Sequence, residues 1–346
     1  MAKVLVTGGS GLIGVYAMKR LAEKGHQVVN YDLVQPSAER SFVLGDLKDE
    51  IPLEKAGVED LPSLLLAVKK HRIEKIVHMA AIVDPEVPHR NPSVAFRLDL
   101  GGTVNVLEAA RVMDLKRVVF MSSIGVYTTK KYEPIDENHP VLQSDEGPVS
   151  TAYGACKVGS EAFCWAYREA FGLDFVALRP SAVYGLGMGS FSLGMFIKPI
   201  VENSIKGEPL RITRGRDYPR DYTYVKDAAQ AIQLAIDVNP SRLRDRVFLV
   251  GTGQKLVTPG QLGEMIKEYI PTADIEIGPG LDEYDKREIL MRGVLDISRA
   301  RQQLGYEPQY DIRKGMQDYI AMFRSYLDET KKGLADPVDT PIVKET

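Results

Sequence analysis

Cysteine is scarce in this sequence, and the two that are present do not suggest a disulfide. Cys156 and Cys164 fall on one predicted helix, where roughly 12 Å of helical rise separates them. Because the Cα atoms of a disulfide lie closer than about 7 Å, we expect both thiols to stay unpaired. Unpaired thiols are typical of a reducing compartment, so we expect a cytoplasmic protein.

Long runs of basic or of apolar residues are also absent. The net charge is −3 and the sequence pI is near 6.0, so we expect no nucleic-acid partner. No apolar stretch approaches the length of a membrane span, and the first predicted strand begins by residue 3. We therefore expect neither a membrane segment nor a signal peptide. His78 and His139 stand without clustered ligands, which favours structural roles and no metal site.

Glycine, in contrast, is concentrated at the N-terminus. Gly8, Gly9, Gly11 and Gly14 lie between a predicted strand at 3–6 and a predicted helix at 12–21. At a strand-to-helix turn, glycine allows close approach of a pyrophosphate, and the helix N-terminus offers free N–H groups. The pattern predicts a phosphate cradle, although a tight turn without a ligand is the alternative.

Asp32 follows a second predicted strand at 26–31, where the dinucleotide fingerprint has its acidic residue. A carboxylate there accepts hydrogen bonds from both ribose hydroxyls and repels a 2′-phosphate. Leu33 offers no positive charge to compensate, so we expect NAD rather than NADP as the cofactor. Arg40, further along the chain, is the residue that could weaken this preference.

Strand-like runs alternate with helical segments along most of the chain. Strands are predicted at 3–6, 26–31, 42–44, 75–79, 117–121, 175–178 and 247–250. This alternation predicts an α/β fold, a Rossmann-type doubly wound parallel sheet with a smaller, discontinuous C-terminal substrate-binding lobe. The expected NAD-binding domain spans 1–179 plus about 222–256, the lobe spans about 180–221 plus 257–330, and residues 331–346 form a tail.

Tyr153 and Lys157 stand four residues apart on a predicted helix and so share one face. A lysine ammonium beside a phenol favours the phenolate, which can then accept a proton. Ser123 follows the strand predicted at 117–121, and a hydroxyl at that edge of a parallel sheet points toward a bound ligand. An ordinary surface pair and a turn-forming serine are the alternatives.

Eight motifs stand in a fixed order along the chain: TGGSGLIG at 7–14, the acid Asp32, GDL at 45–47, HMAA at 78–81, SSIGVY at 122–127, YGACK at 153–157, RPSAVYG at 179–185 and RDYTYV at 220–225. Together they resemble the extended short-chain dehydrogenases/reductases, the NAD-dependent epimerase/dehydratase family, over nearly the whole chain.

The resemblance implies a role for each matching residue. Ser123, Tyr153 and Lys157 would be catalytic, and Ser123, Tyr153 and Arg220 would contact the substrate. The residues implied to hold NAD are Gly8, Gly11, Leu12, Ile13, Gly14, Asp32, Asp46, Leu47, Ala80, Ala81, Tyr153, Lys157 and Pro180.

Departures from the family pattern reduce the number of reactions that we expect. Family members that dehydrate or decarboxylate sugars carry acidic residues after the catalytic hydroxyl, whereas this chain has Ile124 and Gly125. Arg220 matches an arginine that clamps a phosphate of nucleotide-sugar substrates. Ala182, however, replaces an asparagine that helps to hold the diphosphate, and Asp99 replaces another common asparagine. A salt bridge to a neighbouring aspartate is the other reading of Arg220.

We therefore expect an NAD-dependent epimerase of a nucleotide-linked or free sugar, acting through a transient keto intermediate. An NAD-dependent dehydrogenase of a non-nucleotide sugar or other secondary alcohol is the alternative, and a non-enzymatic dinucleotide sensor is a third reading. The resemblance also implies a homodimer, formed by helices predicted at 101–113 and 152–171. Their apolar residues include Val104, Leu107, Val112, Ala155, Val158, Ala162, Phe163 and Tyr167.

Overall fold

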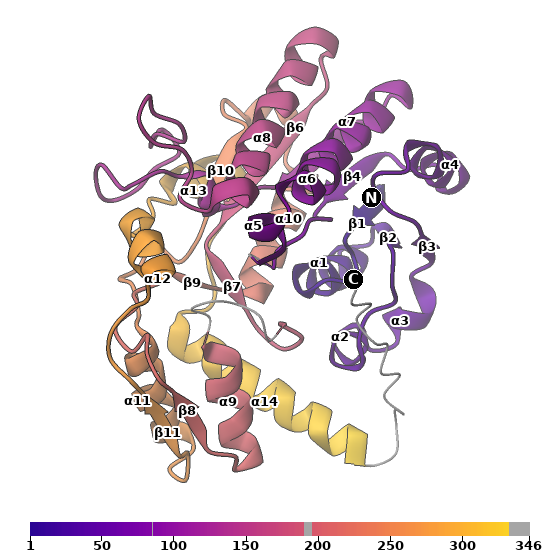
Figure 1. Ribbon diagram of the computed structural model, residues 1–346. Coiled ribbons are helices and arrows are strands. Elements are labelled where there is room, and N and C mark those ends of the chain that lie inside the picture. The colour runs from indigo at the N-terminus through magenta and orange to yellow at the C-terminus, as the bar shows by residue number, and fades with distance from the viewer. Residues whose placement is uncertain (85, 190–195, 332–346) are drawn as a thin grey trace.

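A parallel sheet of seven strands forms the centre of the molecule (Figure 1). The structure is a computed structural model, and it describes residues 1–84, 86–189 and 196–331. The strand order is β10-β6-β5-β4-β1-β2-β3. The strands are β1 (Lys3–Thr7), β2 (Gln27–Asp32), β3 (Leu53–Lys55), β4 (Lys75–His78), β5 (Arg117–Met121), β6 (Phe175–Pro180) and β10 (Val247–Val250). The order reverses between β1 and β4, which is the place where parallel sheets of this type bind ligands.

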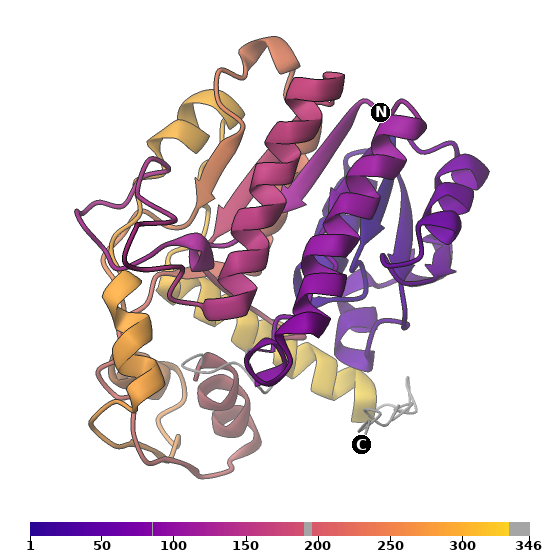
Figure 2. The same ribbon diagram turned by 45° about the horizontal axis from the view of Figure 1, so that its top comes forward.

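Helices cover both faces of the sheet (Figures 1 and 2). One layer contains α4 (Leu61–His71), α7 (Gly102–Val112) and α8 (Thr151–Phe171), and the other contains α1 (Leu12–Glu23) and α10 (Val225–Asp237). Neighbouring strand residues point to opposite layers: Leu5 joins the core under α4 and α7, whereas Val4 and Val6 join the core under α1 and α10. The prediction of a doubly wound α/β fold is confirmed.

Shorter elements connect these layers. They are α2 (Ala38–Leu44), α3 (Leu47–Glu50), α5 (Glu86–Arg90), α6 (Pro92–Ala95), the π-helical η1 (Phe96–Gly101), η2 (Ile124–Val126), η3 (Pro240–Arg242) and α13 (Ser298–Leu304). The strand predicted at 42–44 is wrong, because these residues form the last turn of α2. The strand of this region is instead β3, which pairs with β2.

The remaining elements lie beyond the carboxyl ends of the strands, in the lower part of Figure 1. They are β7 (Ala182–Tyr184), α9 (Ile197–Lys206), β8 (Leu210–Ile212), β9 (Tyr222–Tyr224), α11 (Pro259–Tyr269), β11 (Ile275–Ile277), α12 (Glu283–Glu288), η4 (Ile289–Met291) and α14 (Ile312–Lys331). β7 pairs with β9, β8 pairs with β11, and α9, α11 and α14 pack together. The division into two lobes stays a prediction, and the predicted tail lies almost wholly outside the described residues.

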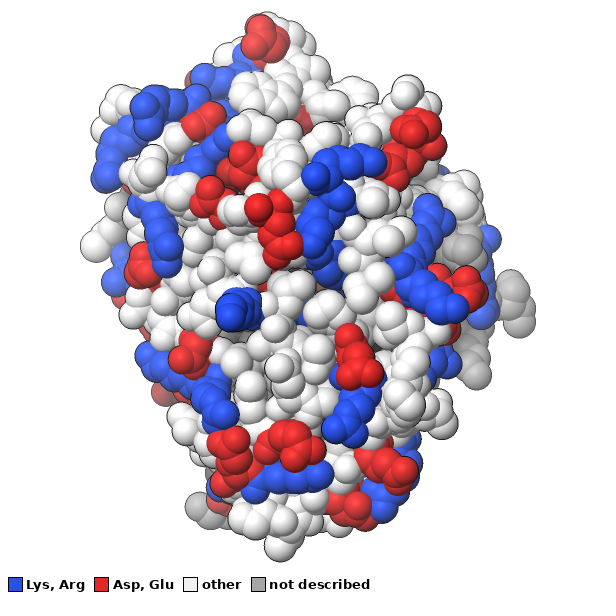
Figure 3. Space-filling model, turned by 90° about the vertical axis from the view of Figure 1, so that its left-hand side faces the viewer, with Lys and Arg blue, Asp and Glu red and all other residues white. Residues whose placement is uncertain are grey.

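Charges of both signs are mixed on the surface seen in Figure 3, where lysine and arginine side chains alternate with aspartate and glutamate. This face does not carry the extended basic stripe that a nucleic-acid backbone attracts. None of the helices in the described part of the chain is long and apolar enough to cross a membrane.

Candidate active site

The glycine turn after β1 brings three backbone segments into close contact. Gly8 has φ +71°, and a Cβ atom there would lie 2.7 Å from the amide nitrogen of Ala80. A Cβ at Gly14 would lie 2.4 Å from the carbonyl oxygen of Gly8. Gly11 occupies the N-cap of α1 without a side chain that would satisfy the first amides of the helix. The turn therefore has the shape and the free N–H groups that a dinucleotide pyrophosphate requires.

Asp32 lies beside this turn, at the end of β2. Its carboxylate accepts hydrogen bonds from the amide of Ser10 at 3.0 Å and from that of Val34 at 3.3 Å. Partial burial raises the pKa of the carboxyl group, and the hydrogen bonds oppose this shift. Arg40 donates to the carbonyl oxygens of Ser10 at 3.1 Å and Gly187 at 2.9 Å. The carboxylate thus lies where a ribose would follow the pyrophosphate, which fits NAD.

Ser123, Tyr153 and Lys157 come together at the carboxyl end of β5. Ser123 forms a hydrogen bond with the Tyr153 hydroxyl, and it caps η2 by accepting the Gly125 amide at 2.9 Å. The Lys157 Nζ atom lies 5.5 Å from the centre of the Tyr153 ring and donates to the Met121 carbonyl oxygen at 2.8 Å. The structure therefore brings together the three residues that the sequence singles out for proton transfer.

The pKa of Tyr153 differs from the sequence-based expectation that the neighbouring lysine favours the phenolate. Burial raises the pKa of Tyr153 to about 12, while the hydrogen bond from Ser123 acts in the opposite direction. Burial also lowers the pKa of Lys157, which the charge of Asp99 opposes. Burial therefore dominates the pKa of both groups, and in the chain alone it keeps the pKa of the phenol far from neutrality.

The other residues assigned to the cofactor surround the same edge of the sheet. Ala80 and Ala81 follow β4, and Pro180 ends β6. Asp46 and Leu47 begin α3, further from the turn in the chain. Leu12 and Ile13 lie in the first turn of α1. Contact of these residues with the cofactor stays a prediction.

Two buried arginines lie on the side of the smaller elements. The guanidinium carbons of Arg220 and Arg292 lie 4.7 Å and 5.9 Å from the centre of the Tyr218 ring. Arg292 forms an ion pair of 2.6 Å with Glu288, which accepts a hydrogen bond from Ser150 at 3.2 Å. These contacts lead from Arg292 to the start of α8, the helix that carries Tyr153 and Lys157.

Sequence reasoning found Arg220 but not Arg292, Tyr218 or Glu288. Tyr218 stands two residues before Arg220 but outside the RDYTYV motif, and Glu288 and Arg292 lie far along the chain, where only the packing of α12 and η4 brings them near Tyr218. Ala182 opens β7 and is 9% exposed, so no side chain there provides the amide that the family pattern has. A Cβ at Gly125 would lie 3.0 Å from Ser150 Oγ and 3.2 Å from Ser123 Oγ, so a side chain there would crowd both hydroxyls.

His78 and His139, the two histidines considered in the sequence analysis, have structural contacts. His78 lies between the hydroxyls of Thr7 at 2.7 Å and Thr103 at 3.0 Å, and burial lowers its pKa to about 3. His139 accepts the Lys131 amide at 2.9 Å. Neither contact set resembles a metal site.

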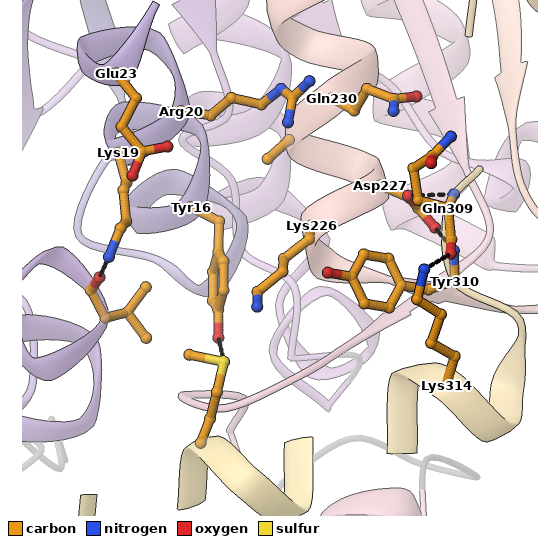
Figure 4. A pocket seen from close by; sticks show the side chains of 13 residues that line it. Tyr16, Lys19, Arg20, Glu23, Lys226, Asp227, Gln230, Gln309, Tyr310 and Lys314 are labelled. Atoms are coloured by element: carbon orange, nitrogen blue, oxygen red, sulfur yellow. Dashed lines mark hydrogen bonds between the residues drawn. The ribbon is translucent and has the colours of Figure 1, made fainter. Parts of the chain in front are cut away.

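A groove of about 530 Å³ opens between α1, α10 and α14 (Figure 4). Its basic lining residues are Lys19, Arg20, Lys226 and Lys314. Lys226 is held by Asp318 at 2.7 Å, and Lys314 donates to the Gln309 carbonyl oxygen at 2.7 Å. None of the residues of the proton-transfer set lines this groove, so the groove is separate from the Ser123, Tyr153 and Lys157 cluster at the sheet edge.

A doubly wound parallel sheet with a close-packed glycine turn, an acidic residue at the end of β2 and a Ser-Tyr-Lys set is typical of a dinucleotide-dependent oxidoreductase of the short-chain class. The profile of the NAD dependent epimerase/dehydratase family matches residues 4–251. The chain belongs to that family, and NAD is its cofactor.

The similarity to known proteins covers almost the whole chain. A putative UDP-glucose 4-epimerase of Methanocaldococcus jannaschii is 30% identical over 92% of this chain and 97% of its own length. The UDP-glucose 4-epimerase of Thermotoga maritima, solved with UDP-glucose, is 26% identical with a TM-score of 0.80, over 94% and 99% of the two chains. That of Thermus thermophilus, solved with NAD, is 25% identical with a TM-score of 0.75, over 93% and 99%.

Proposed function

We propose that this protein is an NAD-dependent epimerase that acts on a nucleotide-linked sugar through a transient keto intermediate. The observation that carries the proposal is the convergence of Ser123, Tyr153 and Lys157. Ser150, at the N-cap of the helix that carries Tyr153 and Lys157, also contacts Glu288, the ion-pair partner of the buried Arg292. The set can move a proton at a sugar hydroxyl, and planar guanidinium groups suit the two phosphates of a nucleotide sugar. The similarity to UDP-glucose 4-epimerases supports the same assignment.

Each residue of the set has a distinct task. Tyr153 accepts the proton of the hydroxyl whose carbon is oxidised and returns it when the ketone is reduced. Ser123 donates a hydrogen bond to the same oxygen, and Lys157 stabilises the phenolate. NAD, when bound, supplies the hydride acceptor and donor. Rotation of the keto sugar between the two steps inverts the configuration, with no net change in the cofactor.

The cofactor is proposed to lie across the edge of the sheet. The close backbone packing at Gly8 and Gly14 and the position of the Asp32 carboxylate beside this turn support this placement. The residues proposed to line it are Gly8, Gly11, Leu12, Ile13, Gly14, Asp32, Asp46, Leu47, Ala80, Ala81, Tyr153, Lys157 and Pro180.

The test is to incubate the purified protein with NAD and a panel of UDP-sugars, and in parallel with the same sugars without the nucleotide. Epimerised UDP-sugar without net NADH supports the proposal. NADH that accumulates in proportion to a free sugar or another secondary alcohol contradicts it and supports a dehydrogenase. Ala182 is the specific feature that favours this second function, since it removes a polar contact to a diphosphate.

The wider assignments follow from the same observations. We propose a cytoplasmic location because Cys156 and Cys164 are both free and buried. The elements of residues 180–221 and 257–330 are proposed to form most of the substrate side, with Arg220 as a substrate ligand. A homodimer is proposed on the surface of α7 and α8.

A further inference from the structure

The helix that carries Tyr153 and Lys157 begins on a strained residue. Thr151, the first residue of α8, has φ +53°. This left-handed conformation is unfavourable for a side chain with a branched Cβ atom, so the surrounding contacts must hold it. Tyr153 follows two residues later, in the first turn of the same helix. The strain therefore lies where it can affect the orientation of the proton-transfer group.

The hydroxyl of Ser150 does not cap this helix. Serine is among the preferred N-cap residues, because its oxygen can accept the free amides of the first turn. Ser150 occupies the N-cap of α8, yet its side chain forms no such bond in the described part of the chain. Its Oγ atom instead donates to Oε1 of Glu288 at 3.2 Å. The contact at this end of the helix thus comes from α12, which is distant in the chain.

Glu288 is held firmly at the other end of this contact. It is the last residue of α12 and is 4% exposed. Its Oε2 atom accepts a hydrogen bond from Arg292 at 2.6 Å, and Oε1 accepts the one from Ser150. A buried ion pair resists displacement, because separation of its members would leave an unpaired charge out of water. The carboxylate is therefore a fixed point for the start of α8.

The start of α8 also packs directly on the segment that carries Ser123. A Cβ atom at Gly154 would lie 2.4 Å from the carbonyl oxygen of Gly125, and one at Gly125 would lie 3.0 Å from Ser150 Oγ. Ser123 in turn accepts the Gly125 amide at 2.9 Å. Because α8 and η2 are so closely packed, a displacement of Ser150 changes the position of Tyr153 relative to Ser123.

We propose that Glu288 is a positioning residue, which holds the start of α8 through Ser150 and so directs the Tyr153 hydroxyl. The ion pair with Arg292 keeps the carboxylate oriented. The strain at Thr151 follows, because the backbone must satisfy the Ser150 contact and the close packing on η2 at the same time. This inference rests on the proposed function for its kinetic tests.

The first test measures the kinetics of Ser150→Ala in the epimerase assay. Loss of the bond to Glu288 frees the start of α8, so kcat should fall by about 10-fold while KM changes little, since misplacement of a reacting group slows chemistry more than binding. Ser150→Thr retains a hydroxyl and should recover most of the parent kcat. Ser298→Ala removes an exposed serine from the start of α13 and should have no effect.

The carboxylate itself is tested by Glu288→Gln, alone and combined with Ser150→Ala. The amide cannot form the ion pair with Arg292 and loses its fixed position, so kcat should again fall. Two residues that act through one contact have effects that are not additive. The double variant should therefore be slowed less than the product of the two single effects.

A further test needs no turnover, because it compares glycine with alanine in thermal unfolding. In an ordinary helical turn alanine is more stabilising than glycine, whereas left-handed backbone favours glycine. Thr151→Gly should therefore unfold at a higher temperature than Thr151→Ala. Ala321→Gly, at an exposed position of α14, should unfold at a lower temperature than the parent protein.

The same comparison in the Ser150→Ala background tests the contact. Without the bond to Glu288 the start of α8 can relax, so the advantage of glycine at position 151 should be lost. If no epimerised sugar is found, this comparison still tests the role of Glu288.

Four outcomes would overturn the assignment. Equal kcat in Ser150→Ala and Ser298→Ala is the first, and a rise in KM alone, which would indicate substrate binding, is the second. The third is a stability order at position 151 that favours alanine, or an advantage of glycine that persists without the Ser150 hydroxyl. Loss of circular dichroism in Ser150→Ala is the fourth, because the contact would then be required for folding and not for the orientation of Tyr153.

Discussion

Burial and hydrogen bonding act in opposite directions on the hydroxyl of Tyr153. Removal from water raises the pKa of this phenol, while Ser123 stabilises its ionised form. The chain alone therefore holds Tyr153 protonated at neutral pH. The proposed reaction requires the balance to change when the site is filled, because a positive charge near the phenol favours the phenolate.

Tyr153→Phe should remove nearly all turnover, by about 100-fold to 10,000-fold, because it deletes the proton-transfer group and keeps the ring. Binding of NAD, measured by calorimetry, should remain close to that of the parent protein. Tyr132→Phe, at an exposed tyrosine, is the control and should retain full activity. Half of the parent activity in Tyr153→Phe would show that another group moves the proton.

Asp32 should determine the preference between NAD and NADP. Asp32→Ala combined with Leu33→Arg removes repulsion of a 2′-phosphate and supplies a cation at a position that is 56% exposed. The ratio of the two dissociation constants should move toward NADP by about 10-fold to 100-fold, the value of a hydrogen bond to a charged group. Leu33→Arg alone is the control, and tighter binding of NADP by the parent protein would refute the role of Asp32.

At the scale of elements, the glycine turn and α1 act as one unit. The carbonyl oxygens of Gly8 and Gly9 lie within 2.5 Å of where a Cβ of Gly14 would be, so the first turn of the helix packs directly on the turn that precedes it. Any side chain at this position must move the helix N-terminus away from the turn that is proposed to hold the pyrophosphate.

Gly14→Ala should therefore weaken NAD binding strongly and destabilise the fold by about 1–3 kcal/mol, the usual cost of overpacking. Gly147→Ala is a matched control, because a Cβ there meets nothing within 4 Å. Fluorescence titration with NAD and thermal unfolding of both variants provide the comparison. Equal NAD affinity in the two variants would argue against a close-packed cradle.

The accuracy of the sequence-based prediction varied with the length of each element. Strands of five or six mostly apolar residues, such as β5 and β6, were recognisable. Residues 42–44 were assigned wrongly, since a short apolar run fits a helix equally well. β3 has the sequence LEK and carries no strand pattern at all. The π-helical turn of η1, which positions Asp99, likewise has no local signal.

The convergence of Ser123, Tyr153 and Lys157 was predictable because these residues occur in motifs with local spacing. Tyr153 and Lys157 lie on one helix, and Ser123 directly follows the end of a strand. Arg292 could not be found in this way, because its neighbour Tyr218 comes from a distant segment and the two meet only through tertiary packing.

At the scale of the whole molecule, α7 and α8 present an apolar surface on one side of the sheet. The two helices lie side by side in Figure 2. Phe163 on α8 is 42% exposed and Val112 on α7 is 51% exposed, and Ala155 and Ala162 are also exposed. Leu107, in contrast, is fully buried and packs inward, so it belongs to the core of the monomer. Exposed apolar residues of this kind favour burial against another chain.

We expect a two-fold homodimer through this surface, since closed two-fold dimers are the commonest assemblies. Light scattering should give about twice the chain mass of 38.4 kDa. Ala162→Glu should shift the protein to the monomer, because an unpaired charge in an apolar interface is costly; a charge at the half-buried Val158 should do the same. Ala321→Glu places the same charge at an exposed alanine of α14 and should leave the dimer intact. If Ala162→Glu has the same mass as Ala321→Glu, or the parent protein is a monomer at micromolar concentration, the α7 and α8 surface does not join two chains.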